Sequence, residues 1–230
     1  MATPDPAEFD TFAADYDRAL GPGIRLVGVP KEVFAESRIR LVATLLRGRP
    51  VRSILDFGCG TGLSIPFLRA TWPSARLLGY DVSAVSLTEA ARRHDLLGVE
   101  YSAQLPVATA FDLIFTHGVL HHIPIVLREG ILRDLGRRLR PGGRLVVSEN
   151  NPWNPLMVWA MARAPMDADA RPLTPHATVR LLRRTGWSPI RCIFTNHIPP
   201  SLPLASRIEC LAAASRFGSQ YLVLTRKSHA

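Results

Sequence analysis

From residue 49 onward, the chain alternates short apolar runs with longer stretches whose apolar residues have helical spacing. The apolar runs predict strands at Ser53–Phe57, Arg76–Tyr80, Val99–Tyr101, Phe111–Thr116, Arg144–Ser148, Ile190–Thr195 and Gln220–Thr225. The intervening stretches predict helices at Leu63–Ala70, Val85–His94, Ile125–Leu139 and Ala177–Arg184. Strands that alternate with helices indicate an α/β fold, a doubly wound sheet with helices on both faces. In such a sheet, ligands bind at the carboxyl ends of the strands.

The N-terminal fifth of the chain precedes this alternation. Residues 1–48 predict two helices, Phe9–Leu20 and Lys31–Arg47, separated by a Gly-Pro-Gly break. A chain of 230 residues is long enough to form one domain with its own hydrophobic core. We therefore expect residues 1–230 to be a single domain.

Two later segments also interrupt the alternation. Residues 150–175 are rich in proline, methionine and tryptophan, and the stretch Trp153–Met166 predicts either a lid over the strand ends or ordinary core. Residues 196–219 carry prolines before a predicted aliphatic helix, Leu204–Phe217. Both segments are candidates for contact with a substrate.

The composition excludes a mainly disordered chain, since 47% of the residues are hydrophobic and 20% are charged. The net charge is +9, from 28 basic and 19 acidic residues. Lys31 and Lys227 are the two lysines, and the arginines are spread from Arg18 to Arg226. The excess of arginine over lysine is typical of coding from a GC-rich genome, and the arginines form no single block, so we expect no nucleic-acid partner.

Cysteine usage and the N-terminus predict the compartment. Cys59, Cys192 and Cys210 form no Cys-x-x-Cys pair, which indicates reduced thiols. Residues 1–17 lack the basic flank and apolar core of a targeting peptide, and no apolar run approaches the roughly 20 residues of a membrane span. We therefore expect a cytoplasmic protein with no membrane span.

The most specific motif is Leu55–Gly62, in which the end of the first predicted strand leads into a glycine loop that opens a helix. Its glycines allow a ligand to approach the backbone closely. A dinucleotide-binding loop places its third glycine three residues after the second, whereas Gly62 follows Gly60 by two. Asp56 lies just before the loop and would repel a pyrophosphate, but it would attract an ammonium group.

A second carboxylate, Asp81, ends the second predicted strand. A carboxylate at this position accepts hydrogen bonds from the two hydroxyls of a ribose. Asp81 therefore indicates a nucleoside. Asp56 and the shortened loop favour S-adenosylmethionine, which carries an ammonium group, a sulfonium and no phosphate. The alternative is a tight turn without a ligand.

The sequence resembles the class I S-adenosylmethionine-dependent methyltransferases, in their small-molecule branch. The motifs that carry the resemblance are Phe9–Asp17, Leu55–Gly62, Gly79–Asp81, Phe111–Pro124, Leu139–Glu149, Glu149–Leu156 and Phe217–Lys227. The last two are similar to a subgroup associated with glycan or natural-product modification. The resemblance implies a Rossmann-like, seven-stranded sheet with a reversed last hairpin. It also implies a helical lid at residues 1–48 and substrate caps at residues 150–175 and 196–219.

The same resemblance assigns cofactor-binding residues. Asp56, Gly58 and Gly60 would hold the methionine moiety, Asp81 the ribose and Val82 the adenine. Tyr16 would close the lid, and Cys59 and Thr116 complete the expected site. The acid that often contacts the adenine amino group after the third strand is missing, and Ser102 or Gln104 could replace it.

Five histidines are candidates for a base that activates the acceptor. His117 is best placed because it ends the fourth predicted strand, and His121 follows it closely. For His121 and its neighbour His122, packing or capping is the alternative, and His176 and His197 lie beside the cap segments. The fourth strand ends without clustered carboxylates, so we expect no metal.

The acceptor itself is not encoded in a recognisable motif. Asn151-Pro152-Trp153 follows the fifth strand, where a structural turn competes with a substrate-edge role. Arg163 and Arg171 lie near the cap and could face an anionic acceptor. The leading hypothesis is a methyltransferase that acts on an O or N of a small molecule, a natural product or a sugar-linked acceptor. The alternatives are an RNA or protein methyltransferase and a non-catalytic cofactor-binding protein.

Overall fold

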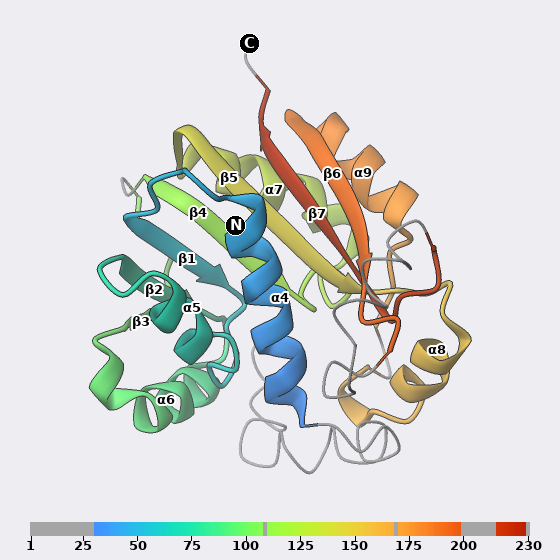
Figure 1. Ribbon diagram of the computed structural model, residues 1–230, viewed down its shortest axis with the longest axis horizontal. Helices are drawn as coiled ribbons and strands as arrows, with labels where there is room; N and C mark the ends of the chain where they lie inside the picture. Colours follow the sequence, from blue (N-terminus) through green and yellow to red (C-terminus); the bar gives the residue numbers. More distant parts are fainter. Residues whose placement is uncertain (1–29, 108–109, 168–169, 199–214, 229–230) are drawn as a thin grey trace.

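The computed structural model describes residues 30–107, 110–167, 170–198 and 215–228. Seven strands form one sheet in the order β3-β2-β1-β4-β5-β7-β6 (Figure 1). The strands are β1 (Ser53–Phe57), β2 (Arg76–Tyr80), β3 (Glu100–Ser102), β4 (Phe111–His117), β5 (Leu139–Asn150), β6 (Trp187–Thr195) and β7 (Gln220–Lys227). Strand β7 runs antiparallel to both of its neighbours, β5 and β6. The doubly wound sheet and its reversed last hairpin are thus confirmed.

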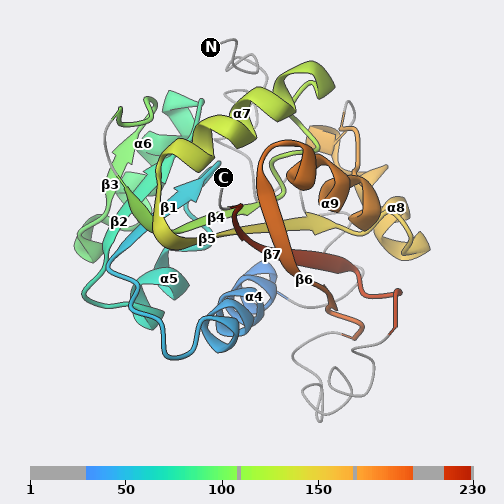
Figure 2. The ribbon, with the colours of Figure 1, turned by 90° about the horizontal axis from the view of Figure 1, so that it is seen from above.

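Helices cover both faces of this sheet. They are α4 (Lys31–Leu45), α5 (Ile65–Thr71), α6 (Ala84–Arg93), α7 (Ile125–Arg137), α8 (Pro155–Met161) and α9 (Pro175–Arg184), with short 3₁₀ turns at Asp95–Leu97 and Pro165–Asp167. Helices α7 and α9 lie on one side of the sheet, and α4 and α5 lie on the other (Figure 2). None of the helices that the structure describes is long and apolar enough to cross a bilayer.

Alternation along the strands produces the two cores. Leu55, Ile114 and Val147 pack with residues of α7 and α9, whereas their chain neighbours on the strands face α4 and α5. Trp187 is the largest fully buried side chain, and its indole Nε1 donates to the Leu132 carbonyl at 3.2 Å. Leucine and β-branched residues on both faces of the central strands are what a sheet covered on both sides requires.

Side chains cap three of the helices. The Ser83 hydroxyl accepts from the Ser86 N–H at the start of α6, 3.0 Å away. The side chains of Asn154 and Thr174 cap α8 and α9, and each of these two helices has a proline in its first turn. A proline there leaves no backbone donor unsatisfied.

Two predicted boundaries around the fifth strand are wrong. Strand β5 begins at Leu139 instead of Arg144, and α7 ends at Arg137 instead of Leu139. Leu139 pairs with Phe111 across a bulge, and this early pairing ends the helix. The sixth strand likewise begins three residues earlier than predicted because Trp187 pairs with Lys227.

Other differences are small or lie at the edge of the described chain. Strand β3 is displaced by one residue from its predicted position, and α5 begins at Ile65 because the glycine loop continues to Ser64. The predicted helix Phe9–Leu20 lies outside the described residues. So does most of Leu204–Phe217, of which residues 215–217 are described and are not helical.

Helix α4 is part of the core. Its Ile39 and Val42 side chains are buried against the sheet face that α5 also covers. The remainder of the predicted N-terminal lid, residues 1–29, lies outside the described chain. Residues 150–175 begin beyond the C-terminal end of β5, where α8 is seen (Figure 1).

Candidate functional site

The glycine loop after β1 is tied to the end of β2. The N–H groups of Gly58 and Cys59 donate to the Tyr80 carbonyl, at 2.7 and 2.9 Å. Gly58, Gly60 and Gly62 all have positive φ, at 74°, 51° and 85°. A Cβ at Gly58 would lie 2.3 Å from the side chain of Val119, whereas no described atom lies within 4 Å of a Cβ placed at Gly60. Gly60 therefore leaves open space beside the backbone.

Asp56 is buried at the end of β1. Its side chain is 3% exposed, and its Oδ2 has no hydrogen-bond partner among the residues that the structure describes. Burial, and then the charge of Asp81, raises the pKa of Asp56 to about 7, although the positive charge of Arg38 opposes them. A buried carboxylate oxygen without a donor is costly unless a cation or donor occupies the adjacent space.

Asp81 lies at the end of β2, directly beside the loop. Its Oδ2 accepts from the Gly60 N–H at 2.8 Å, and its Oδ1 accepts from the Ser83 N–H at 3.0 Å. Val82 packs against the larger core cluster. The structure thus brings Asp56, Gly58, Gly60 and Asp81 together at one edge of the sheet, as the spacing predicted.

The burial and hydrogen bonds of three other predicted cofactor residues, Cys59, Ser102 and Thr116, are described by the structure. Cys59 is buried in the loop, and burial raises the pKa of its thiol well above the usual value. The Ser102 hydroxyl donates to the Gln104 carbonyl at 2.7 Å and accepts from the Gln104 N–H, which closes a turn after β3. Thr116 in β4 is 1% exposed, and its Oγ1 has no hydrogen-bond partner within the described chain. Tyr16 lies outside the described residues.

His117 ends β4, and its Nδ1 lies 3.1 Å from the Ser148 hydroxyl of β5. Burial, and then the nearby charges of Arg38 and His121, lowers the pKa of His117 well below 6.5. The ring is therefore neutral at pH 7. Arg38 reaches this edge from α4, is 2% exposed, and donates to Gln220 at 2.9 Å.

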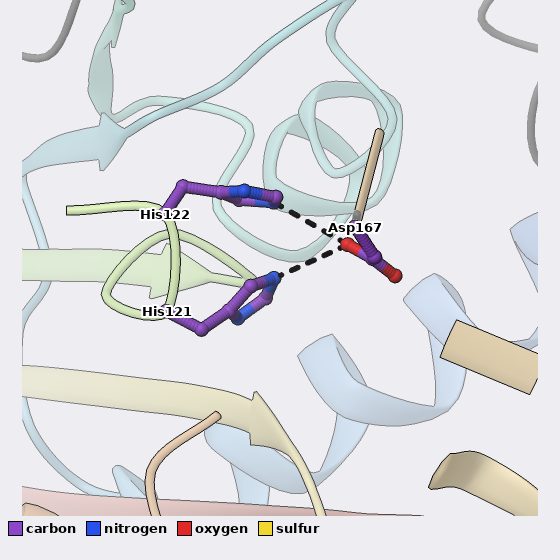
Figure 3. A group of neighbouring side chains, drawn as sticks. All are labelled: His121, His122 and Asp167. Carbon is purple, nitrogen blue, oxygen red and sulfur yellow. Dashed lines mark ion pairs between the residues drawn. The ribbon is translucent and has the colours of Figure 1, made fainter. Parts of the chain in front are cut away.

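His121 contacts two carboxylates, Glu149 and Asp167, and His122 contacts Asp167; neither carboxylate was predicted to belong to the site. The Nδ1 of His121 contacts Glu149, which also accepts from the Leu120 N–H at 2.8 Å. The Nε2 atoms of His121 and His122 lie 3.6 and 3.5 Å from Oδ1 of Asp167 (Figure 3). Burial lowers the pKa of His121, but the two carboxylates outweigh it and raise that pKa to about 9. Burial and the adjacent His121 lower the pKa of His122 to about 4.

The remaining candidates lie away from this group or serve the fold. His176 packs against Trp153, with ring centroids 5.2 Å apart and ring planes tilted by 58°, and His197 Nε2 lies 3.2 Å from the Ser215 carbonyl. The Asn151 amide donates to the carbonyls of Arg216 and Gly218, and its oxygen accepts from the Trp153 N–H. These bonds favour the structural turn as the role of Asn151-Pro152-Trp153.

The two arginines near the cap are engaged locally. The Arg163 guanidinium lies 3.8 Å from the centre of the Trp159 ring. The Arg171 backbone N–H donates to the His121 carbonyl at 2.8 Å, and its carbonyl accepts from Arg128. Arg171 thus helps to hold residues 150–175 against the loop that follows β4.

A glycine loop followed by an acid at the end of β2, on a seven-stranded sheet with this strand order, is typical of a class of cofactor-dependent transferases, and the comparisons agree. A family described as "Methyltransferase domain" matches residues 55–145. Trans-aconitate 2-methyltransferase of Azoarcus sp. (strain BH72) is 32% identical over 181 residues, covering 68% of this chain and 70% of the relative. The chain belongs to the class I S-adenosylmethionine-dependent methyltransferases.

Further matches extend this picture. Malonyl-[acyl-carrier protein] O-methyltransferase of Hahella chejuensis (strain KCTC 2396) is 36% identical over 145 residues, or 61% of this chain. The match spans 47% of that relative's length, which is less than half of it. The solved structure of the DhpI–SAH complex is 18% identical and superposes with a TM-score of 0.61, covering 98% of this chain and 96% of that one. This likeness shows the fold.

Proposed function

We propose that this protein transfers a methyl group from S-adenosylmethionine to an oxygen of a small carboxylic acid. The observation that supports the cofactor assignment is the buried Asp56 oxygen without a donor in the described chain, at the strand end that leads into the glycine loop. An ammonium group that reached this oxygen would satisfy it and stabilise the carboxylate. The residues present therefore fit the cofactor of the family.

In this proposal, each cofactor residue has a separate task. Asp56 and the loop from Gly58 to Gly60 hold the methionine end, with Cys59 and Thr116 completing its wall. Asp81 accepts hydrogen bonds from the ribose hydroxyls, and Val82 packs on the adenine. Ser102, already in a turn with Gln104, borders the adenine edge. When bound, the cofactor would supply an electrophilic methyl group on a sulfonium.

The charges at the end of β4 support an acidic acceptor. A hydroxyl acceptor must lose a proton, and the neutral His117, with its lowered pKa, is a weak base for that purpose. A carboxylic acid is already ionised at pH 7 and needs no base. The buried positive charge of Arg38, which acts on both Asp56 and His117, would attract such an anion.

Methyl transfer to a carboxylate requires no proton to be removed. A carboxylate oxygen forms the new O–C bond as the S–C bond breaks, so the sulfonium becomes a neutral thioether and the acid becomes a methyl ester. The named substrates of the two relatives, trans-aconitate and malonyl-acyl carrier protein, carry carboxylates and support this class. We assign to His117 the role of a hydrogen-bonding contact to the acceptor, while both nitrogens of His121 already face carboxylates.

We also propose that residues 150–175 form the acceptor cap. Asp167 and Arg171 of this segment both contact the loop that follows β4, where the acceptor would enter. Residues 1–29 and most of residues 196–219, the other expected lid and cap segments, lie outside the described chain.

An acceptor panel tests the proposal. The purified protein is incubated with S-adenosylmethionine and either small di- and tricarboxylic acids, hydroxylated natural products and sugars, or amines, and S-adenosylhomocysteine is quantified by mass spectrometry. We expect turnover with an acid, and a product that hydroxide cleaves because it is an ester. Turnover confined to hydroxyl or amine acceptors would overturn the acceptor class. Failure to bind cofactor or product in calorimetry would overturn the proposed activity.

A matched pair of variants on α4 tests the role of Arg38. Arg38→Gln removes the buried charge, whereas Arg40→Gln removes an exposed one that pairs with Glu36. We expect the first variant to raise the KM for the acid about tenfold or more, as for loss of a charge-assisted hydrogen bond, and the second to leave KM unchanged. Equal KM values in both variants, with binding of S-adenosylhomocysteine intact, would contradict this role.

A further inference from the structure

We propose that His121, His122 and Asp167 bind a divalent transition metal ion of the Zn²⁺ type. Their three ligand atoms lie within 4.8 Å of one another. Figure 3 shows both rings directed at the same carboxylate, with Oδ1 of Asp167 at 3.6 and 3.5 Å from the two Nε2 atoms. The site is formed by the loop after β4 and the 3₁₀ turn Pro165–Asp167.

The distances fit a shared ion better than direct hydrogen bonds. An N–H···O bond spans about 2.7–3.2 Å, which is shorter than either contact. Two ligands held at 2.0–2.1 Å from a tetrahedral Zn²⁺ are roughly 3.3–3.4 Å apart. Both N···O distances are within about 0.3 Å of that separation, and all three ligand atoms lie within 4.8 Å of one another.

The surroundings of His121 have the form that metal-bound histidines require. Its Nδ1 contacts the Glu149 carboxylate, and Glu149 is itself held by the Leu120 N–H. A histidine that donates Nδ1–H to a carboxylate presents the lone pair of Nε2 on its other side. Without metal, Glu149 and Asp167 favour a proton on this Nε2. A metal ion that displaces the proton would take its place between Nε2 and the Asp167 oxygen.

Burial and ligand type make the site selective. His121 is 3% exposed, and the side chains of His122 and Asp167 are 14% and 10% exposed. Two imidazoles and one carboxylate are a donor set typical of zinc and similar ions, and three protein ligands leave a fourth position for water or another oxygen ligand. The expectation of no metal depended on the end of the fourth strand, whereas Asp167 arrives from a segment after the fifth.

The test uses full-length protein without a histidine tag, stripped with a chelator and then titrated with ZnCl₂ in a calorimeter. We expect about one equivalent to bind, and Co²⁺ in its place to give the visible absorption of a tetrahedral complex. His122→Ala and Asp167→Asn should lose this binding, and Glu149→Gln should weaken it 10- to 100-fold. The control His176→Ala removes a histidine outside the cluster and should bind as the wild type does.

Failure of the metal proposal can be distinguished from failure of the proposed function. Binding of S-adenosylhomocysteine, measured on the same samples, reports on the fold and the cofactor site whether or not metal binds. If the folded wild-type protein takes up no Zn²⁺ or Co²⁺, a proton occupies the space and the metal proposal fails. It also fails if His176→Ala reduces uptake as much as His122→Ala, or if Asp167→Asn binds as well as the wild type.

Discussion

Replacing Asp56 with Asn should stabilise the ligand-free protein at alkaline pH and weaken its binding of cofactor at the same time. The reason is the position of the carboxyl group, which is buried with one oxygen lacking a donor in the described chain. Such a group destabilises the fold when it is ionised and no cation is present. Asparagine has nearly the same shape and carries no charge.

The raised pKa sets the size of the effect. Burial and Asp81 move the pKa of Asp56 from 3.8 to about 7, and each pKa unit corresponds to about 1.4 kcal/mol. Between these values the folded protein holds a proton that the unfolded chain releases, so wild-type stability falls as pH rises and the loss is complete above pH 7. The stability gained by Asp56→Asn should grow from near zero at pH 4 to as much as about 4 kcal/mol at pH 8.

Cofactor binding should follow the opposite trend. If the carboxylate pairs with the ligand ammonium group, binding below pH 7 must expel the proton from Asp56, and wild-type affinity should fall about tenfold per pH unit there. Urea unfolding between pH 4 and pH 8 measures the stability, and titration of S-adenosylhomocysteine in buffers of different ionisation heat counts the protons released. The exposed carboxylate of Asp95 provides a control variant, Asp95→Asn, that should show neither effect.

Two results would refute this reasoning. Parallel stability profiles for the wild type and Asp56→Asn would mean that Asp56 is not destabilised by burial. Binding of S-adenosylhomocysteine without proton release at pH 6 would mean that the Asp56 carboxylate is not the partner of the ammonium group.

Four further predictions concern the loop and the core. Asp81→Ala should weaken binding of S-adenosylhomocysteine by at least about 1 kcal/mol in calorimetry, and an unchanged affinity would contradict the ribose assignment. Gly60→Ala places a methyl group in open space, so it should cost only the positive-φ strain of about 1 kcal/mol in urea unfolding while reducing cofactor affinity; unaltered affinity would exclude this space as the cradle. Gly58→Ala should destabilise the protein by more than that strain, since the new methyl group also clashes with Val119. In the double variant with Val119→Ala, the part of the lost stability that exceeds the strain should return, and a double variant no more stable than Gly58→Ala would indicate another cause. Trp187→Ala should lower the free energy of unfolding by about 3–5 kcal/mol, and a loss below 1 kcal/mol would contradict its burial in the core.

The cofactor edge of the site was predictable because its residues are close in sequence to strand ends. Asp56 lies near the end of the first apolar run and Asp81 directly follows the second, and parallel strands bring their carboxyl ends to the same edge. The structure adds the pairing of β1 with β2 and the hydrogen bond from Gly60 to Asp81. The resemblance implied the seven strands and the reversed last hairpin, and no strand order was predicted.

The acceptor side was not predictable to the same degree. Asp167 lies in an irregular segment with no periodic pattern, and its contact with His121 depends on how residues 150–175 fold back. The sequence pattern indicates a polar helix position for Arg38. The structure buries this side chain, where it donates a hydrogen bond to Gln220, which lies far along the chain. Glu149 directly follows the predicted strand Arg144–Ser148, and only the long-range pairing of β4 with β5 places it beside His121.

The close approach of Val119 to Gly58 has a consequence for how strongly the two proposed ligands influence each other's binding. Val119 belongs to the segment that leads into His121, so the glycine loop and the loop after β4 are packed tightly together, and a Cβ at Gly58 would lie 2.3 Å from the valine side chain. A ligand that fixes one loop restricts the conformations available to the other loop. Where this raises the affinity for the second ligand, thermodynamic reciprocity requires the second ligand to raise the affinity for the first by the same factor. Val119 would therefore couple binding of the cofactor to binding of the acceptor, and Val119→Ala should make the two affinities independent.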